Sequence, residues 1–282
     1  MKISKVGVVG GGTMGNGIAQ VCATSGLSVM MLDIDQESLD RGLGAISSSL
    51  ERLVRKDQLS VNDRELAMQR IQTTTDYTDL ADVDLVIEAA SEVEKVKLSI
   101  ISTLDKIVRK DTIIASNTSS MSITLLAAAS SAPNRVIGMH FFNPVPVMML
   151  VELIRGLQTD DSTQQAAESF VKQINKTAIS VKNSAGFAVN RILVPMINES
   201  VFVLQEGVAS AKDIDDGMRL GCNHVIGPLA LADLIGLDTL LSVMEVFYRS
   251  YNDPKYRPAP LLREMVEAGY LGRKSGQGFY AY

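Results

Sequence analysis

The stretch KVGVVGGGTMGNGIAQ, residues 5–20, decides the fold expected for the first half of the chain. Its β-branched residues predict a strand, its glycines a tight turn, and its last residues a helix. In the spacing G-x-G-x-x-G, the first glycine permits the turn, the second lets a pyrophosphate approach the backbone, and the third lets the helix pack on the strand. The stretch therefore predicts a dinucleotide site, with contacts expected at Gly10, Gly12, Thr13, Met14 and Gly15.

An acidic residue at the end of the next predicted strand indicates which dinucleotide binds. Asp33 follows the turn by about 20 residues. A carboxylate there accepts hydrogen bonds from the ribose hydroxyls and repels a 2′-phosphate, so NAD is expected rather than NADP. Asp35 and the absence of arginine at positions 34–36 agree with this choice. By the motif alone, a flavin nucleotide or a simple strand–helix turn stays open.

Strands and helices alternate through the first half of the chain. Short β-branched runs that predict strands lie at residues 6–9, 29–32, 83–87, 112–115 and 136–139. With helices between them, they predict a Rossmann-type, doubly wound α/β sheet. In the helix expected at 92–108, the apolar stripe from Val93 and Val96 to Ile107 is expected to face the sheet, leaving Lys95, Lys97 and Lys106 to water.

Two departures from this alternation define the domain organisation. Residues of about 36–72 predict a helical hairpin inserted into the sheet domain. After residue 184 the strand pattern stops, and helices are expected at 187–206, 210–220, 227–247 and 259–268. We therefore expect an NAD-binding domain at 1–184 and an all-helical domain at 185–282, whose many apolar residues predict a homodimer formed through it.

Composition and charge exclude several classes of protein. The net charge is −5, the isoelectric point is about 5.2, and no block of consecutive basic residues occurs, so no nucleic acid or membrane partner is expected. No apolar run reaches the ~20 residues that span a bilayer. The two cysteines, Cys22 and Cys222, lack the spacing of a metal or redox motif. We expect a cytoplasmic protein without a metal site.

His140 closes the strand predicted at 136–139, at the edge of the sheet where ligands gather. If the proline-bearing link after it folds back, Glu152 becomes its neighbour in a hairpin. A carboxylate there would fix the imidazole tautomer and stabilise the imidazolium that forms when histidine takes a proton from an alcohol. The alternative is a buried histidine with no part in chemistry.

The segment ASNTSS, residues 115–120, follows another strand to the same edge. Asn117, Ser119 and Ser120 are expected either to donate hydrogen bonds between nicotinamide and substrate or to cap a helix at 122–129. A serine hydrolase is disfavoured because the segment lacks the G-x-S-x-G motif.

Taken together, these motifs resemble the L-3-hydroxyacyl-CoA dehydrogenase family, and within it the bacterial short-chain 3-hydroxybutyryl-CoA dehydrogenases. The resemblance runs nearly end to end and includes HFFNPVPVMMLVE at 140–152, GFAVNR at 186–191 and GRKSGQGFYAY at 272–282. It implies a reversible, NAD-dependent oxidation of (S)-3-hydroxybutyryl-CoA to acetoacetyl-CoA. His140 would be the general base, Glu152 would orient it, and Ser119 and Asn190 would contact the substrate.

The resemblance also implies further binding residues. For the cofactor they are Glu88, Ala89, Ala90, Lys95, Asn117, Asn143 and Lys274. For the helical hairpin it implies a CoA site, where Arg52 and Lys56 would hold phosphates. A solvated charged face explains these two cations equally well, and the family often carries lysine where Arg52 stands.

Two other functions stay open at this point. A non-catalytic NAD-binding protein is one, because the family's fold also occurs in a lens crystallin. The presence of His140 and Glu152 speaks against it. A free 3-hydroxy acid dehydrogenase is the other, but that class uses a catalytic lysine where this chain has Asn190 and Arg191.

Overall fold

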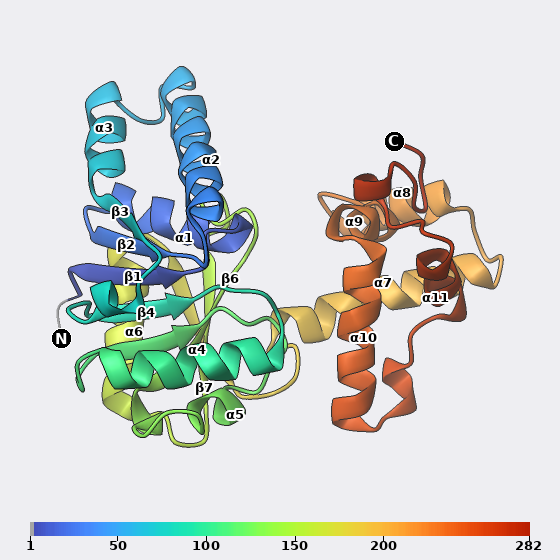
Figure 1. Ribbon diagram of the computed structural model, residues 1–282. Coiled ribbons are helices and arrows are strands. Elements are labelled where there is room, and N and C mark those ends of the chain that lie inside the picture. The colour runs from blue at the N-terminus through green and yellow to red at the C-terminus, as the bar shows by residue number, and fades with distance from the viewer. Residues whose placement is uncertain (1–2) are drawn as a thin grey trace. The chain divides into compact units, whose positions relative to one another are not determined.

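The computed structural model describes residues 3–282, which divide into two compact units. The first unit ends at Ser184 and combines a sheet with helices. The second, Ala185–Tyr282, is helical (Figure 1).

The sheet of the first unit has eight strands within the described residues, in the order β3-β2-β1-β4-β5-β6-β7-β8. They are β1 (Lys5–Val9), β2 (Ser28–Leu32), β3 (Ile71–Thr74), β4 (Leu85–Glu88), β5 (Ile113–Ser116), β6 (Val136–Phe141), β7 (Leu150–Arg155) and β8 (Thr177–Lys182). Neighbouring strands are parallel except β6 and β7. The predicted Rossmann-type sheet is confirmed. The sequence pattern missed the edge strands β3 and β8, which are partly exposed and carry few buried apolar residues.

Helices cover both faces of the sheet, which makes it doubly wound (Figure 1). On one face, β1 residues pack with Ile18, Leu39 and Phe170, which belong to α1 (Thr13–Thr24), α2 (Gln36–Arg55) and α6 (Asp161–Gln173). The other face is covered by α4 (Glu94–Ile107) and α5 (Ile123–Ala127). Two short 3₁₀ helices, η1 (Tyr77–Leu80) and η2 (Pro133–Arg135), complete the unit.

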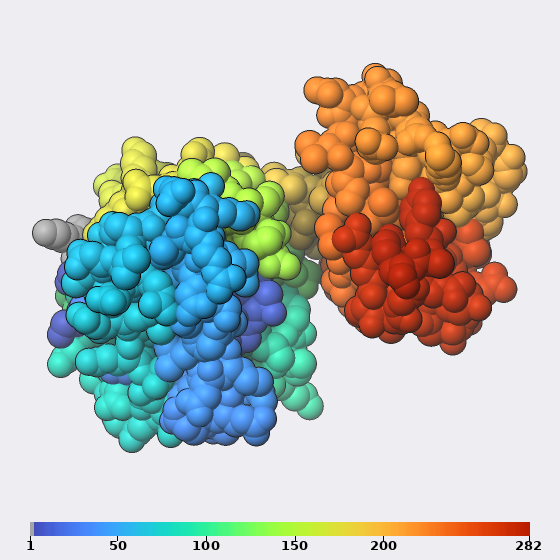
Figure 2. Space-filling model, turned by 90° about the horizontal axis from the view of Figure 1, so that it is seen from above, coloured from blue at the N-terminus to red at the C-terminus, as the bar shows by residue number. Residues whose placement is uncertain are grey.

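The predicted helical hairpin is present as α2 and α3 (Val61–Gln69). The Ser60 hydroxyl caps α3 by accepting a hydrogen bond from the Asp63 amide at 3.0 Å. Figure 2 shows that α2 and α3 form much of the surface of the first unit at this end. The hairpin therefore offers a long exposed surface, and it starts beside the glycine turn at residues 10–15.

The packing expected for α4 is wrong at the start of the helix. Val93 and Val96 are 50% and 38% exposed, whereas Lys97 is 1% exposed and belongs to the buried face with Ile100 and Leu104. The reason is that Lys97 finds carboxylate partners inside the unit, as described below. An apolar stripe alone cannot show that a lysine has such partners.

The second unit contains α7 (Val189–Gln205), α8 (Ala211–Cys222), α9 (Pro228–Ile235), α10 (Leu237–Tyr251) and α11 (Pro260–Glu267), with 3₁₀ turns η3 (Pro254–Tyr256) and η4 (Arg273–Ser275). The single helix expected at 227–247 is wrong, because Gly236 separates α9 from α10 with φ +100°. Buried Asp233 fastens the C-terminal segment by accepting hydrogen bonds from the amides of Phe279 and Tyr280 at 2.9 and 3.0 Å. No helix within residues 3–282 has the length and apolarity needed to cross a membrane.

Candidate active site

The glycine turn is built for close backbone approach. Gly10 has φ +106°, and a Cβ atom on it would lie 2.7 Å from the Ala89 carbonyl oxygen. A Cβ on Gly15 would lie 1.7 Å from the Gly10 carbonyl oxygen, so only glycine lets α1 pack this closely. Around Gly12, by contrast, a Cβ would meet nothing within 4 Å. That open space, in front of the free amides of the first turn of α1, is where a pyrophosphate fits.

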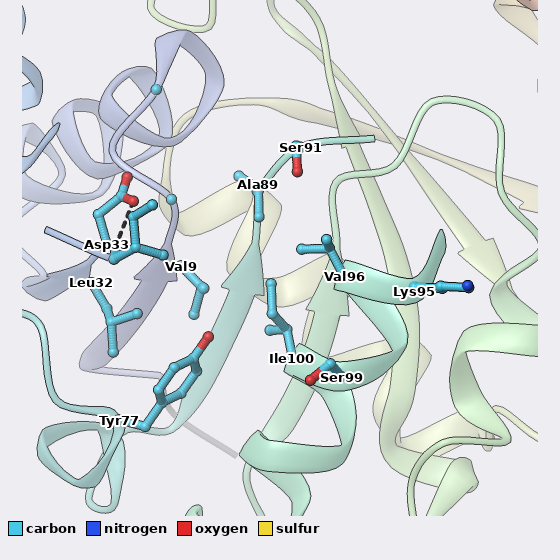
Figure 3. A pocket seen from close by; sticks show the side chains of 14 residues that line it. Val9, Leu32, Asp33, Tyr77, Ala89, Ser91, Lys95, Val96, Ser99 and Ile100 are labelled. Atoms are coloured by element: carbon cyan, nitrogen blue, oxygen red, sulfur yellow. Dashed lines mark hydrogen bonds between the residues drawn. The ribbon is translucent and has the colours of Figure 1, made fainter. Parts of the chain in front are cut away.

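A cavity of about 710 Å³ opens beside this turn (Figure 3). Its apolar walls include Leu32, Val96 and Ile100, and Asp33 lies on its rim. Both Ala89 and Ala90 line it, as the predicted cofactor contacts require. The size and the largely apolar lining suit one half of a dinucleotide.

Asp33 is held in place by two backbone amides. Its carboxylate accepts hydrogen bonds from Gly11 at 2.6 Å and from Ile34 at 2.7 Å. This fixed carboxylate can accept hydrogen bonds from ribose hydroxyls without rearranging. Asp35, in contrast, caps α2 through the Ser38 amide, and this hydrogen bond lowers the pKa of Asp35. Asp35 therefore serves the helix.

Two residues of the cavity were missed by the sequence argument. Tyr77, in η1, points its hydroxyl into the cavity (Figure 3), where burial and the charges of Glu88 and Asp33 raise its pKa. Val96 leaves an apolar surface open on the cavity wall. The sequence argument had instead placed Val96 on the stripe of α4 that faces the sheet. Lys95 also lines the cavity, and its ammonium group extends away from Asp33 in Figure 3.

Glu88 does not line the cavity, although the sequence predicted a cofactor contact for it. Its fully buried carboxylate accepts hydrogen bonds from the Ala90 amide at 2.8 Å, the Lys97 ammonium at 2.7 Å and the Ser116 hydroxyl at 2.6 Å. Glu88 therefore shapes the loop that carries Ala89 and Ala90. A buried carboxylate needs such complete pairing, because an unpaired charge is costly away from water.

A second carboxylate ties this network to the segment ASNTSS. Glu92 pairs with Lys97 at 3.3 Å and accepts a hydrogen bond from the Ser119 amide at 3.0 Å. Burial opposes ionisation of Glu92, but Lys97 and the hydrogen bonds from Thr118 and Ser119 outweigh it and hold its pKa below the usual value. Ser119 is thereby fixed at the edge of the sheet near the cofactor loop.

The alternative role of this segment as a helix cap is wrong, because Ser122 caps α5. Asn117 instead accepts a hydrogen bond from the Phe141 amide at 2.9 Å through its side-chain oxygen. It thus fastens the end of β6, directly after His140.

His140 and Glu152 face each other across the antiparallel strands β6 and β7. His140 Nδ1 lies 2.7 Å from Glu152 Oε2, and the two side chains are 7% and 0% exposed. Because a carboxylate only accepts hydrogen bonds, Nδ1 carries the hydrogen, and Nε2 of the neutral imidazole is the nitrogen that takes a proton. The Phe142 ring packs at 4.5 Å from the imidazole, and the Asn143–Pro144 peptide bond is cis.

Comparison with known proteins shows the family to which the chain belongs. Residues 5–184 match the NAD binding domain of 3-hydroxyacyl-CoA dehydrogenase, and residues 186–282 match the C-terminal domain of that enzyme. The chain belongs to the 3-hydroxyacyl-CoA dehydrogenase family. It is an NAD-dependent oxidoreductase.

Several known proteins match the chain over nearly its whole length. A probable 3-hydroxybutyryl-CoA dehydrogenase of Deinococcus radiodurans is 52% identical over 99% of this chain and 100% of its own. The 3-hydroxybutyryl-CoA dehydrogenase of Bradyrhizobium diazoefficiens is 50% identical over 99% of this chain and 96% of its own. The crystal structure of (S)-3-hydroxybutyryl-CoA dehydrogenase from Ralstonia eutropha has a TM-score of 0.98 and 60% identity, covering 100% of this chain and 99% of that one.

The remaining predicted site residues of the dehydrogenase lie apart from the cavity or in the second unit. Arg52 and Lys56 are exposed at the end of α2, and neither forms an ion pair with a carboxylate of residues 3–282. Asn143 is exposed in the link after β6. In the second unit, Asn190 lies in the first turn of α7, and the Lys274 ammonium pairs with Asp238 at 2.5 Å. Among residues 3–282, no cluster of three side chains suits a metal ion.

Proposed function

We propose that this dehydrogenase reversibly oxidises (S)-3-hydroxybutyryl-CoA to acetoacetyl-CoA. The proteins similar to it over their full length carry the name of this activity. The observation that carries the chemistry is the buried pair of His140 and Glu152, which makes Nε2 the imidazole nitrogen that takes a proton, at the edge of the sheet where ligands gather.

In the proposed mechanism, His140 Nε2 takes the proton of the C3 hydroxyl as the C3–H bond breaks. Bound NAD⁺ supplies the hydride acceptor, and the open space at Gly12 and the fixed Asp33 carboxylate fit this cofactor. Glu152 keeps the imidazole in the required tautomer and stabilises the imidazolium that forms. In the reverse direction the imidazolium returns its proton to the C3 oxygen. Ser119 and Asn190 are proposed to hold the C3 oxygen and the thioester.

The remaining cofactor and assembly assignments are also proposals. We propose that Thr13, Met14 and Lys95, with Asn117, Asn143 and Lys274, contact NAD. We also propose that the protein is cytoplasmic and forms a homodimer through its second unit. The second unit exposes several large apolar side chains, among them Ile192, Leu220 and Val225. Such exposed apolar groups are typical of a surface that another subunit covers.

Steady-state kinetics with acetoacetyl-CoA test both the reaction and the choice of cofactor. We expect oxidation of NADH, and a much lower kcat/KM with NADPH, because the Asp33 carboxylate repels the 2′-phosphate. Asp33→Ala should narrow the ratio of kcat/KM values between NADH and NADPH by about 10-fold or more, since it removes both the hydrogen bonds and the repulsion. Asp35→Ala is the matched control, because that carboxylate caps a helix. An unchanged ratio in Asp33→Ala would refute this account of cofactor choice.

A second measurement tests the proposed CoA contacts of α2. Arg52→Ala should raise KM for acetoacetyl-CoA by about 5-fold or more, because a charge-assisted contact to a phosphate is lost. The same variant should hardly change the kinetics with free acetoacetate. Arg55→Ala, three residues along the same helix, is the control because Arg55 already pairs with Glu51. Equal effects of Arg52→Ala on both substrates would show that Arg52 belongs to a solvated face.

A further inference from the structure

Lys176 is a buried cation that no step of the proposed mechanism uses. It lies between α6 and β8 and is 7% exposed. Its ammonium group donates hydrogen bonds to the carbonyl oxygens of Val145 at 2.7 Å and Met148 at 2.6 Å. No carboxylate within residues 3–282 forms an ion pair with it.

A lysine in this position is costly to bury. Removing an ammonium group from water without a counter-charge costs several kcal/mol, and two carbonyl dipoles recover only part of that. In agreement, burial lowers the pKa of Lys176. The thiol of Cys22 interacts electrostatically with Lys176, but burial raises the pKa of this thiol to about 12, so it stays neutral. An apolar side chain would fill the space at lower cost, which raises the question of what the ammonium group does.

The two carbonyl groups belong to the segment 142–149, which links β6 to β7. His140 lies just before this segment and Glu152 just after it. A link of this length is too long for the turn to fix the geometry by itself, in contrast to a two-residue hairpin. The segment therefore needs anchors, and it also carries Phe142, which packs on the imidazole, and the exposed Asn143.

The structure supplies two such anchors. Val145 is buried against α1 at Gly17, where an added Cβ would lie only 2.9 Å from the Val145 Cβ atom. On the other side, Lys176 holds the segment at two points, and the amide of the next residue, Thr177, donates to the Met149 carbonyl at 2.8 Å. The segment is thus held between α1, which follows the glycine turn, and the start of β8.

We propose that Lys176 is a positioning residue for the reaction: its ammonium group clamps the segment 142–149, and thereby holds the His140 imidazole and Asn143 in the geometry for proton and hydride transfer. This inference rests on the proposed function of His140. Lys176 itself contacts neither reacting atom, and it acts through the backbone of the segment.

The test compares Lys176→Met with Arg135→Met in the full chain. Arg135 is an equally buried cation, paired with Asp105 at 2.8 Å and placed just before β6, at the strand end opposite to His140. Both variants lose stability. Measured well below its melting temperature, Lys176→Met should lower kcat with acetoacetyl-CoA and NADH by about 20-fold or more, as expected for a misplaced catalytic group. Its KM for acetoacetyl-CoA should change less than about threefold, and Arg135→Met should keep kcat within about twofold.

Chemical rescue separates the clamp from general stability. In Lys176→Ala, added propylammonium should restore kcat in a dose-dependent way, because it supplies N–H donors to the vacated space. Tetramethylammonium, which has no N–H group, should not restore it. If Lys176→Met fails to fold, Lys176→Ala, which also lacks N–H donors, replaces it in the comparison with Arg135→Met.

Several outcomes would overturn the inference. They are a folded Lys176→Met or Lys176→Ala protein with the kcat of the unaltered protein, an equal loss of kcat in Arg135→Met, and equal rescue by both ammonium ions. None of them bears on the proposed function, which the His140→Gln variant tests separately.

Discussion

His140→Gln is expected to lower turnover with acetoacetyl-CoA and NADH by at least ~10², because it removes the group proposed to exchange a proton with the C3 oxygen. Glutamine keeps a hydrogen-bonding side chain opposite Glu152, so the fold and the binding of NADH should change little. Fluorescence titration of NADH and steady-state kinetics on the same preparation measure the two properties separately.

The chain provides a matched control for this variant. His224 is the only other histidine, and it lies after α8 in the second unit. His224→Gln should leave turnover within about twofold, as expected for a side chain outside the chemistry. Near-normal turnover of His140→Gln would remove histidine from the mechanism, and the pair with Glu152 would then be structural.

Lys97→Met is expected to reduce the free energy of unfolding by about 3–5 kcal/mol, because it leaves the Glu88 carboxylate charged and buried without its cation. Glu88 is 0% exposed, and Lys97 lies 2.7 Å from it. Urea unfolding of the cofactor-free protein measures the change. The loss should exceed that of any exposed lysine on the same helix.

Two further variants make this prediction specific. Lys95→Met, two residues earlier on α4, removes an exposed ammonium group and should cost no more than about 0.5 kcal/mol. The double variant Glu88→Gln with Lys97→Met should recover part of the loss, because it removes the uncompensated charge. If Lys97→Met reduced the free energy of unfolding by less than about 1 kcal/mol, Glu88 and Lys97 would not be the strongly interacting buried ion pair described here.

Those features of the fold that depend on local steric rules were predictable from the sequence. The three glycines of the turn occupy positions where a Cβ would either collide with backbone or close the open space at Gly12. The hairpin of α2 and α3 followed from a regular apolar stripe and a capping serine at position 60. The meeting of His140 and Glu152 was predicted on the condition that the proline-bearing link between two apolar runs folds back, which makes the two residues neighbours on paired strands. In each case the interaction lies within one short segment, or between neighbouring strands.

Features that depend on distant partners were not predictable. Lys97 appeared as a water-facing residue because its pairing with Glu88 is a tertiary contact across α4 and β4. The cavity residues Tyr77 and Val96 carry no motif, since they only complete a wall. The break at Gly236 was overlooked because the apolar pattern continues from α9 into α10. Burial and pairing, which decide these cases, are set by the packed structure.

The position of the histidine–glutamate pair along the chain has one consequence for turnover. Both partners, the cavity and the segment that Lys176 holds lie before residue 185, inside a single compact unit. The pairing of His140 with Glu152, on which the proposed proton transfer depends, is therefore set by contacts within the first unit, as are the walls of the nucleotide pocket.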